Sequence, residues 1–348
     1  MGNLSAIDLF AGAGGLSKGL DQAGFEILWA NEKNPAAAAT YKYNHMRTEL
    51  FTGDIRKISR SFLRKEFRDL VLVAGGPPCQ GFSFAGKRNI KDPRNQLLAS
   101  FCSAVETIKP KLFLMENVKG LLSFNQGNTI NKVKRRLEKA GYHVTTSVLN
   151  AADFGVPQLR ERVFIMGSID SKITLDIPKY KQVPAADAIS DLAFLDSGEK
   201  SNEYKCLPTT DFQKGMRGIT TLQNHEAAIH SKGVIRRFSL LKPGCDSKTL
   251  PSEVRTKKKI VYKLHPRLPS RTVTTLPEDI IHYSKNRILT VRELARLQSF
   301  PDSYIFLGPR TTGGERRKNS CPQYTQVGNA VPPLLAKAIG AALVRCIA

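Results

Sequence analysis

Residues 1–170 alternate short apolar runs with segments of helical periodicity, and this alternation limits the possible folds more than any other feature. Two helical patterns, at 95–109 and 128–139, follow apolar runs of buried-strand length. Repeated strand–helix units of this kind predict a parallel, doubly wound α/β sheet. The strands that we expect are 5–10, 25–31, 70–74, 111–115, 143–150 and 162–168.

The pattern breaks after residue 172. From 173 to about 270 the chain is polar, rich in Lys, Thr and Pro, and carries basic runs at Arg236-Arg237 and Lys257-Lys258-Lys259. A segment of this composition is either a floppy insertion or a second, smaller domain of irregular structure that contacts a polyanion.

Regular structure is expected again near the end of the chain. Thr290 and Glu293 form a T-x-x-E capping box ahead of a short helix, and 332–346 is a mostly apolar helical pattern. Because the apolar faces of that last helix need a core to cover them, we expect it to pack on the first domain. The predicted domains are therefore 1–172 with 271–348, and an insertion at 173–270.

The charge of the chain is strongly positive. Lys and Arg total 53 against 30 Asp and Glu, which gives a formal net charge of +23. A surplus of this size favours a nucleic acid partner, because phosphate backbones attract such surfaces, although a merely basic surface has the same composition. Charge alone does not separate DNA from RNA.

Cysteine usage and the absence of long apolar runs bear on the compartment. The six cysteines form no C-x-x-C pair and no zinc-like spacing, and the N-terminus lacks the features of a signal peptide. No run approaches the roughly 20 apolar residues of a membrane span. We expect a cytoplasmic protein, in bacteria at the nucleoid, that binds no metal and no membrane.

A glycine-rich turn lies where the first strand meets the first helix. The turn, DLFAGAGG at 8–15, lets a ligand approach the backbone closely, and Glu32 at the end of the second strand suits a ribose diol. Asp54, after Gly53, is placed to accept a hydrogen bond from an adenine amino group. Because the turn matches neither G-x-G-x-x-G nor a P-loop, S-adenosylmethionine fits better than a pyrophosphate cofactor.

Cys79 follows the third apolar run, 70–74, and its neighbours are prolines and glycines that restrict or free the backbone. The segment GGPPCQGFS at 75–83 places Cys79 at the carboxyl end of a strand, after two prolines and before a glycine. A lone cysteine is more often a small core residue, but a core residue needs no such neighbours. Cys79 is therefore a candidate nucleophile, with a small core residue as the open alternative.

Polar and charged side chains near the next strands are further candidate active-site residues beside Cys79. Glu116 follows the 111–115 strand, so a carboxylate would face the same crevice as Cys79. In QLRER at 158–162, alternate residues of an extended segment share a face, which predicts that Gln158, Arg160 and Arg162 bind a carbonyl, a phosphate or Glu116. A surface salt bridge for Glu116 and a solvated strand for the arginines remain open alternatives.

These pieces, in this order, resemble the cytosine-5 DNA methyltransferases of bacterial restriction–modification systems. The matching motifs, which cover most of the chain outside the variable region, are DLFAGAGG at 8–15, GGPPCQGFS at 75–83, MENV at 115–118, QLRER at 158–162, RTVTTL at 271–276 and QVGNAVPP at 326–333. The resemblance implies a Rossmann-like S-adenosylmethionine-dependent methyltransferase sheet, with the smaller domain at 173–270 inserted for target recognition.

The resemblance also implies a mechanism and partners. A cytosine flips out of double-stranded DNA, Cys79 adds to its carbon 6, Glu116 holds ring N3, and Arg160 and Arg162 support the base. Carbon 5 then takes the methyl group, which leaves S-adenosylhomocysteine. A cognate restriction endonuclease would be a genetic companion, and we expect a monomer.

The same likeness assigns further residues to the cofactor and to DNA. The expected cofactor contacts are Phe10, Gly12, Gly14, Glu32, Lys33, Asp54, Ile55, Pro78, Leu97, Asn329 and Val331. The expected DNA contacts are Gln80, Ser83, Lys87 and Arg88 in a closing loop, together with Gln158, Arg236 and Arg237. Weaker candidates for base recognition are Arg217, Gln223 and Asn224.

Three rival functions are less well supported. A tRNA cytosine-5 methyltransferase shares the core, but the long variable region and the lack of a Cys-Phe-Thr motif argue against it. A non-catalytic DNA-binding relative is disfavoured by the intact Cys79, Glu116, Arg160 and Arg162. A Rossmann-type oxidoreductase would need the pyrophosphate turn that this chain lacks.

The charge leads to a testable expectation for DNA binding. A groove lined by many Lys and Arg should lose affinity by about 100-fold or more between about 50 and 200 mM salt, because condensed counterions compete for the phosphates. Fluorescence anisotropy on a labelled duplex measures this slope. Affinity that stays constant over this range would contradict a phosphate-binding groove.

Overall fold

The computed structural model describes residues 4–78, 95–218, 221–255, 261–311 and 320–347. The chain divides into two compact units. Unit 1 comprises Met1–Asn150, Glu161–Lys179 and Pro333–Ala348, and unit 2 comprises Ala151–Arg160 and Tyr180–Pro332.

Unit 1 is built on a seven-stranded sheet of order β3-β2-β1-β4-β5-β7-β6. Strands β1 to β5 pair in parallel, whereas β7 runs antiparallel to both β5 and β6. The strands are β1 Ser5–Leu9, β2 Glu26–Glu32, β3 Glu49–Thr52, β4 Leu72–Gly75, β5 Leu112–Val118, β6 His143–Asn150 and β7 Glu161–Ser168.

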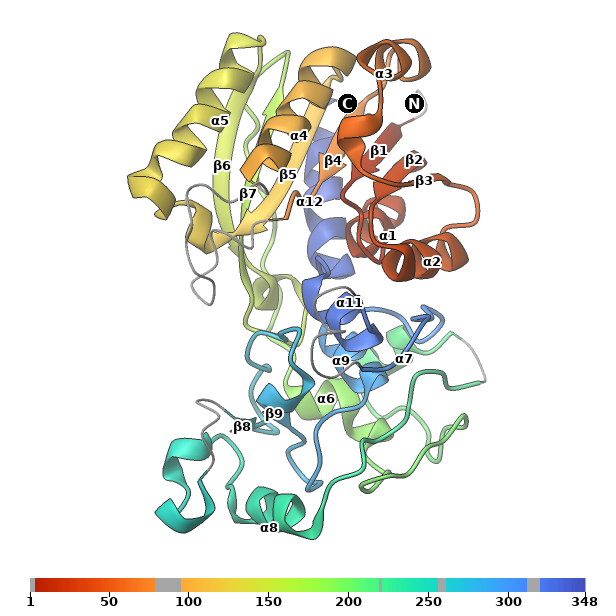
Figure 1. Cartoon of the computed structure of the whole chain (residues 1–348), viewed down its shortest axis with the longest axis vertical. Helices are drawn as coiled ribbons and strands as arrows, with labels where there is room; N and C mark the ends of the chain where they lie inside the picture. Colours follow the sequence, from red (N-terminus) through yellow and green to blue (C-terminus); the bar gives the residue numbers. More distant parts are fainter. Residues whose placement is uncertain (1–3, 79–94, 219–220, 256–260, 312–319, 348) are drawn as a thin grey trace. The chain divides into compact units, whose positions relative to one another are not determined.

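Helices connect these strands and cover the sheet. In chain order they are α1 Gly15–Gln22, α2 Pro35–Asn44, α3 Arg60–Glu66, α4 Asn95–Ile108, α5 Asn128–Lys139 and, after unit 2, α12 Pro333–Arg345. Helix α4 contacts both α3 and α5, and α1 contacts α12 (Figure 1).

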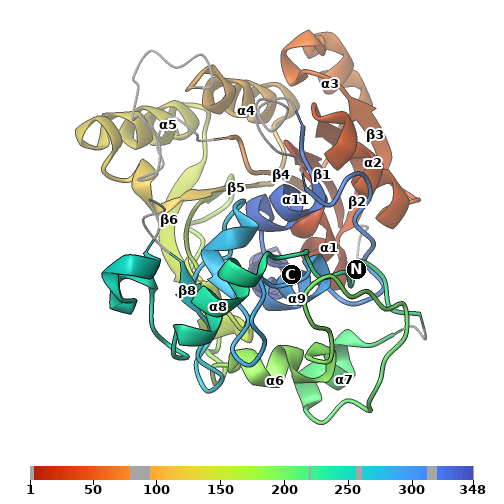
Figure 2. The ribbon, with the colours of Figure 1, turned by 60° about the horizontal axis from the view of Figure 1, so that its bottom comes forward.

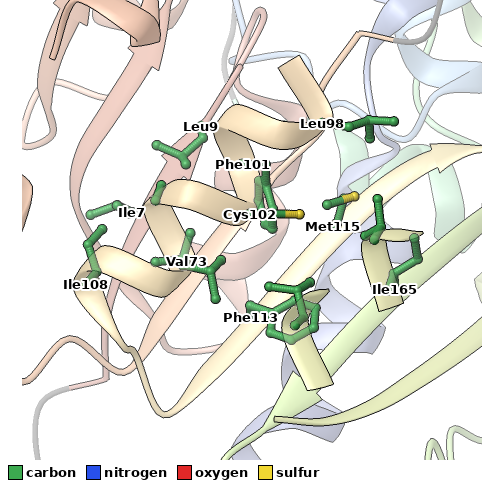
Figure 3. Close-up of a cluster of buried hydrophobic side chains, with 14 of the residues drawn as sticks. Ile7, Leu9, Val73, Leu98, Phe101, Cys102, Ile108, Phe113, Met115 and Ile165 are labelled. Atoms are coloured by element: carbon green, nitrogen blue, oxygen red, sulfur yellow. The ribbon is translucent and has the colours of Figure 1, made fainter. Parts of the chain in front are cut away.

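The main core of unit 1 lies between the sheet and the row of α3, α4 and α5. Helix α4 contributes Leu98, Phe101 and Ile108, which meet strand residues such as Val73 and Met115 (Figure 3). Burying a large apolar side chain contributes about 1.5–3 kcal/mol. This continuous core holds the strand ends, where the predicted site residues lie, in a fixed register.

Local signals in the sequence explain where several helices begin. The Asn34 side chain accepts hydrogen bonds from the amides of Ala36 and Ala37, so it caps α2 as its position before Pro35 predicts. Both reciprocal bonds of the predicted capping box, between Thr290 and Glu293, are present at the start of α9.

Unit 2 has little regular structure. Its helices are α6 Ala185–Ile189, α7 Asp211–Met216, α8 Lys232–Leu240, α9 Val291–Leu297 and α11 Gln323–Asn329, and its strands are β8 Tyr262–Lys263 and β9 Ile280–Ile281. Helix α6 packs against both α7 and α9, and α9 packs against α11 (Figure 2).

Buried ion pairs occupy the interior of unit 2. Arg296 is fully buried and donates to Asp191 at 2.8 Å and to Asp302 at 2.6 Å. Arg287 pairs with Glu293 at 2.8 Å; burial alone would raise the pKa of Glu293, but the neighbouring Arg287 lowers it to about 2. Each charge is thus compensated, as burial requires.

The division of the chain differs from the predicted boundaries. Residues 151–160 and 271–332, which we assigned to the catalytic domain, belong to unit 2. The reason is a set of hydrogen bonds between segments far apart in sequence, such as those from Arg160 to Val273 and Gly328. The return of the last helix to unit 1 agrees with the expectation that it needs the first core.

Among the described residues, one stretch, 323–345, is apolar and long enough to cross a membrane by length and composition. It consists of α11 and α12, which are separated at 330–332, and 67% of its most apolar window is buried inside the protein. Core helices of globular proteins have the same character.

The contact between α1 and α12 leads to a stability prediction. A Cβ on Gly19 would collide with the carbonyl of Pro333 and the side chain of Ala336, so Gly19→Ala should destabilise the fold by about 1–3 kcal/mol. Gly215→Ala in α7 is the matched control, because a Cβ there meets nothing within 4 Å and should stabilise by about 0.5–1 kcal/mol. Urea unfolding measures both; equal stability of Gly19→Ala and the wild type would contradict this packing.

Candidate active site

The glycine-rich turn after β1 has an open backbone. Phe10, Gly12 and Gly14 have φ angles of 60°, 57° and 90°, in the left-handed region. A Cβ on Gly12 would meet nothing within 4 Å, so the space beside this turn is unfilled. The chain therefore offers a ligand direct access to main-chain atoms at the carboxyl end of β1.

Glu32 joins this turn to the end of β2. Its carboxylate accepts hydrogen bonds from the amide of Gly12 at 2.9 Å and from the amide of Asn34 at 2.6 Å. Burial raises the pKa of Glu32 above its ordinary value. The predicted ribose acceptor thus lies directly beside the glycine turn, with its position fixed by two backbone donors.

Asp54 lies after β3 and caps the short 3-10 helix η1 (Ile55–Lys57). Its side chain accepts from Arg56 at 2.6 and 2.9 Å and from Lys33 at 3.2 Å. The hydrogen bond from Arg56 holds the pKa of Asp54 well below its usual range. The next residue, Ile55, is buried.

A buried chain of hydrogen bonds lies beside the glycine turn, and no motif in the sequence predicts it. Ser17 in α1 donates to Asp8 at 2.6 Å and also shares a hydrogen bond of 2.8 Å with the Tyr41 hydroxyl. Burial raises the pKa of Asp8 to about 7. The only sequence signal is a charged residue inside an apolar strand.

The residues of this edge of the sheet fit S-adenosylmethionine. Unit 1 brings together carboxylate acceptors for a ribose and an amino group, Glu32 and Asp54, beside a turn with unfilled space. Pro78 and Leu97 are half-buried in the same unit, whereas Asn329 and Val331 belong to unit 2. Within the described ranges, no group of three or more His, Cys, Asp or Glu is arranged to hold a metal ion.

The segment that leads into Cys79 is tied to β5. The Asn117 side chain donates to the carbonyl of Pro77 at 3.1 Å, and a Cβ on Gly76 would lie 3.3 Å from the carboxylate of Glu116. Glu116 in turn forms an ion pair of 3.0 Å with Arg162 of β7. The predicted pairing of Glu116 with an arginine of the QLRER segment is therefore present, although Glu116 lies inside β5 rather than after it.

Gln158 and Arg160 lie in unit 2 and are both buried. Arg160 donates to the carbonyls of Gly328 and Ala330, at 2.9 and 3.1 Å, and so holds the turn that carries Asn329. The side-chain Nε2 of Gln158 donates to the carbonyl of Leu297 and to Oε1 of Gln298. These bonds lie within unit 2, and the predicted contacts of Gln158 with DNA and of Arg160 with the base stay predictions.

Several predicted residues lie outside the part of the chain that the structure describes. They are Cys79, Gln80, Ser83, Lys87, Arg88 and Lys257-Lys258-Lys259. Their assignments remain predictions.

The candidates for DNA recognition in unit 2 differ in whether their side chains already bond to other residues of the protein. Arg217 forms an ion pair of 2.6 Å with Asp191 and lies over the Tyr204 ring, and Asn224 bonds to the backbone of Phe306. Arg237 donates to the carbonyl of Val254, also in unit 2. Two candidates remain exposed, with no side-chain partner among the described residues: Gln223 and Arg236.

Comparison with known proteins identifies the class of enzyme. The family model described as C-5 cytosine-specific DNA methylase matches residues 4–345. The chain belongs to this family, and the predicted DNA (cytosine-5) methyltransferase is confirmed. The predicted α/β sheet of S-adenosylmethionine-dependent methyltransferases is confirmed as well, and it has seven strands.

Curated relatives match nearly the whole chain. The type II methyltransferase M1.HphI of Haemophilus parahaemolyticus is 40% identical, over 99% of this chain and 87% of its own length. The type II methyltransferase M.DdeI of Desulfomicrobium norvegicum is 38% identical, over 97% of this chain and 87% of its own length.

Solved structures have the same fold. The crystal structure of a prophage-encoded DNA modification methyltransferase from E. coli superposes with a TM-score of 0.82 at 27% identity, covering 99% of both chains. The Dnmt2 methyltransferase of S. pombe, at 20% identity and a TM-score of 0.61, covers 99% of both chains and shows likeness of fold alone.

The raised pKa of Asp8 predicts a pH dependence of stability. Because the folded pKa, about 7, lies above the ordinary 3.8, the contribution of this carboxyl is fully present below pH 3.8 and is lost as pH rises through 7. The free energy of unfolding of Asp8→Asn, relative to the wild type, should therefore rise by about 2–4 kcal/mol between pH 4 and pH 7 and then level off.

Urea unfolding at several pH values measures this change. Asp21→Asn is the matched control, because it alters the same functional group at an exposed position of α1. A constant difference between Asp8→Asn and the wild type over the whole range would contradict the burial cost.

Proposed function

We propose that the chain transfers a methyl group from S-adenosylmethionine to carbon 5 of a flipped cytosine, within a specific double-stranded DNA sequence, through a covalent Cys79 adduct. The observation that supports this most directly is the tie between β4 and β5. Asn117 holds Pro77, and Gly76 lies beside Glu116, so the segment ending in Cys79 starts next to a carboxylate. A nucleophile and an acid on adjacent strand ends are what addition to a cytosine ring requires.

The chemistry follows from those two groups. The Cys79 thiolate forms a bond to carbon 6, Glu116 holds ring N3, and the electron pair of the 5,6 double bond becomes available at carbon 5. The cofactor, when bound, supplies a methyl group on a positively charged sulfur. After methylation, a base removes the proton from carbon 5, the double bond re-forms, and the bond between Cys79 and carbon 6 breaks.

Arg162 and Arg160 have different roles in this proposal. The ion pair of the half-buried Arg162 with Glu116 orients the carboxylate. Arg162 then supports the flipped base. Arg160 acts as a positioning residue, because its Nη2 donates to the two carbonyls that flank Asn329 and its Nη1 donates to the carbonyl of Val273. We propose that it shapes the turn through which Asn329 and Val331 contact the cofactor.

On the cofactor side, we propose that Glu32 accepts from the ribose and that Asp54 accepts from the adenine amino group. Phe10, Gly12 and Gly14 provide the open turn, and the remaining contacts are Lys33, Ile55, Pro78 and Leu97. The turn is supported by the buried hydrogen bonds that join Ser17 to Asp8 and Tyr41.

Unit 2 is the proposed reader of the target sequence. Its exposed Gln223 and Arg236 are side chains of types that bind base edges and phosphates. The likeness to type II methyltransferases supports a role as the modification enzyme of a restriction–modification system. We propose a cytoplasmic monomer, with a cognate endonuclease as its genetic companion.

Loss of the nucleophile tests this function. Cys79→Ala should abolish methylation, because no bond to carbon 6 can form, while duplex binding stays within about threefold of the wild type. Cys206→Ala is the matched control, because Cys206 is an exposed cysteine in unit 2. Bisulfite sequencing of DNA from a host that expresses each variant measures methylation and gives the recognition sequence.

The outcome separates the proposal from its rivals. Methylated cytosines in one fixed context with the wild type and Cys206→Ala, but not with Cys79→Ala, support the proposal. Wild-type turnover by Cys79→Ala would refute the covalent mechanism. A folded wild-type protein that methylates no DNA would refute the proposed activity.

A further inference from the structure

Arg56 connects two segments of unit 1 that are 40 residues apart in sequence. Its Nε donates to Asp54 Oδ1 at 2.9 Å and its Nη2 donates to Asp54 Oδ2 at 2.6 Å. Its Nη1 donates to the side chain of Gln96, in the first turn of α4, at 3.3 Å. All three kinds of guanidinium nitrogen are therefore engaged.

Arg56 and Lys33 together fill the hydrogen-bond acceptor sites of the Asp54 carboxylate. A carboxylate has about four lone-pair sites, two on each oxygen. Oδ1 accepts from the amide and the Nε of Arg56, at 3.1 and 2.9 Å, and Oδ2 accepts from Nη2 of Arg56. The fourth site, on Oδ2, is occupied by the Lys33 ammonium at 3.2 Å.

The donors differ in how firmly they are held. Arg56 makes a two-pronged contact with the carboxylate, a geometry that fixes the plane of both groups. Lys33 makes one longer contact from a side chain that is 72% exposed. A ligand donor that approaches Asp54 therefore displaces Lys33 at lower cost than it displaces Arg56.

We infer that Arg56 is a positioning residue for the cofactor: it fixes the Asp54 carboxylate so that the Oδ2 site covered by Lys33 is left for the exocyclic amino group of adenine. The inference rests on the proposed use of S-adenosylmethionine. Because Gln96 precedes Leu97, Arg56 also ties the adenine acceptor to the turn of α4 that carries another proposed cofactor contact.

A role in stability alone does not account for this arrangement. The Arg56 side chain is 46% exposed, and ion pairs at such positions contribute about 0–1 kcal/mol to folding. Orientation of the carboxylate, by contrast, affects every hydrogen bond that a ligand makes to it. The effect of Arg56 should therefore appear in ligand discrimination rather than in unfolding.

The test compares two ligands that differ only in the amino group. Isothermal titration calorimetry, without DNA, measures the Kd of S-adenosylhomocysteine and of its analogue in which unsubstituted purine replaces adenine. For the wild type, the analogue should bind about tenfold more weakly, since it lacks one hydrogen bond to a charged acceptor. In Arg56→Gln this ratio should fall to about two- to threefold, because the carboxylate is no longer fixed.

Two further variants sharpen the result. Arg60→Gln removes the same charge from an exposed arginine in α3 that has no partner among the described residues, and it should keep the wild-type ratio. Arg56→Lys keeps the charge without the two-pronged contact, and it should show the reduced ratio. Thermal unfolding verifies that all variants are folded.

The outcomes distinguish the inference from the function on which it rests. A wild-type ratio in Arg56→Gln, or equal weakening of both ligands, would overturn the role of Arg56 and leave the cofactor assignment intact. A folded wild-type protein that binds neither ligand would overturn the cofactor assignment and the inference together.

Discussion

The position of β1 between β2 and β4 is the constraint on which the rest of unit 1 depends. This strand pairs in parallel with β2 on one side and β4 on the other, so the carboxyl ends of all three strands lie at one edge of the sheet. A Cβ on Gly75 would collide with the carbonyl of Leu9, which shows how closely β4 approaches β1 at that edge. The turn at Gly12, the carboxylate of Glu32 and the segment leading to Cys79 all start from these strand ends. The proposed cofactor and nucleophile sites therefore share one origin, and a change in strand register would move both.

Unit 2 has few strands and only short helices, so regular secondary structure satisfies fewer of its buried polar groups. Its interior uses arginine side chains as connectors between irregular segments. Arg292, for example, is fully buried and donates to the carbonyls of Gln223, Pro301 and Tyr304. One guanidinium thus replaces several backbone hydrogen bonds that a sheet would supply. The pattern also explains why a basic composition overstates the charge available to DNA: part of the surplus is used inside the protein.

The sequence predicted six of the seven strands of the sheet, the helices α4, α5, α9 and α12 and the chemical class of the site, because these follow from local periodicity and from motifs at strand ends. Strand β3, helix α3 and the short helices α6, α7, α8 and α11 of unit 2 were missed. Strand β3 has only four residues and pairs on one side alone, so its apolar signal is weak. The sheet is also not wholly parallel, since the pairing of β7 is set by partners distant in sequence. The burial of Gln158 and Arg160 could not be predicted for the same reason, because their partners lie more than 110 residues further along the chain. The alternation in QLRER predicted that Gln158 and Arg160 share one face of an extended segment. It could not predict whether that face contacts a ligand or the backbone of the protein itself.

The division of the chain has a consequence for which sequence changes unit 2 can tolerate. Unit 2 is not one continuous insertion, since it takes 151–160 from the middle of unit 1 as well as 180–332. If only residues 180–332 were replaced by those of another protein, the new segment would have to pack against the original Gln158 and Arg160. The hydrogen bonds of Arg160 to the carbonyls of Val273, Gly328 and Ala330 require only backbone at those positions. Many different side chains could therefore stand at these positions without breaking the hydrogen bonds of Arg160, provided that the backbone path near them is kept.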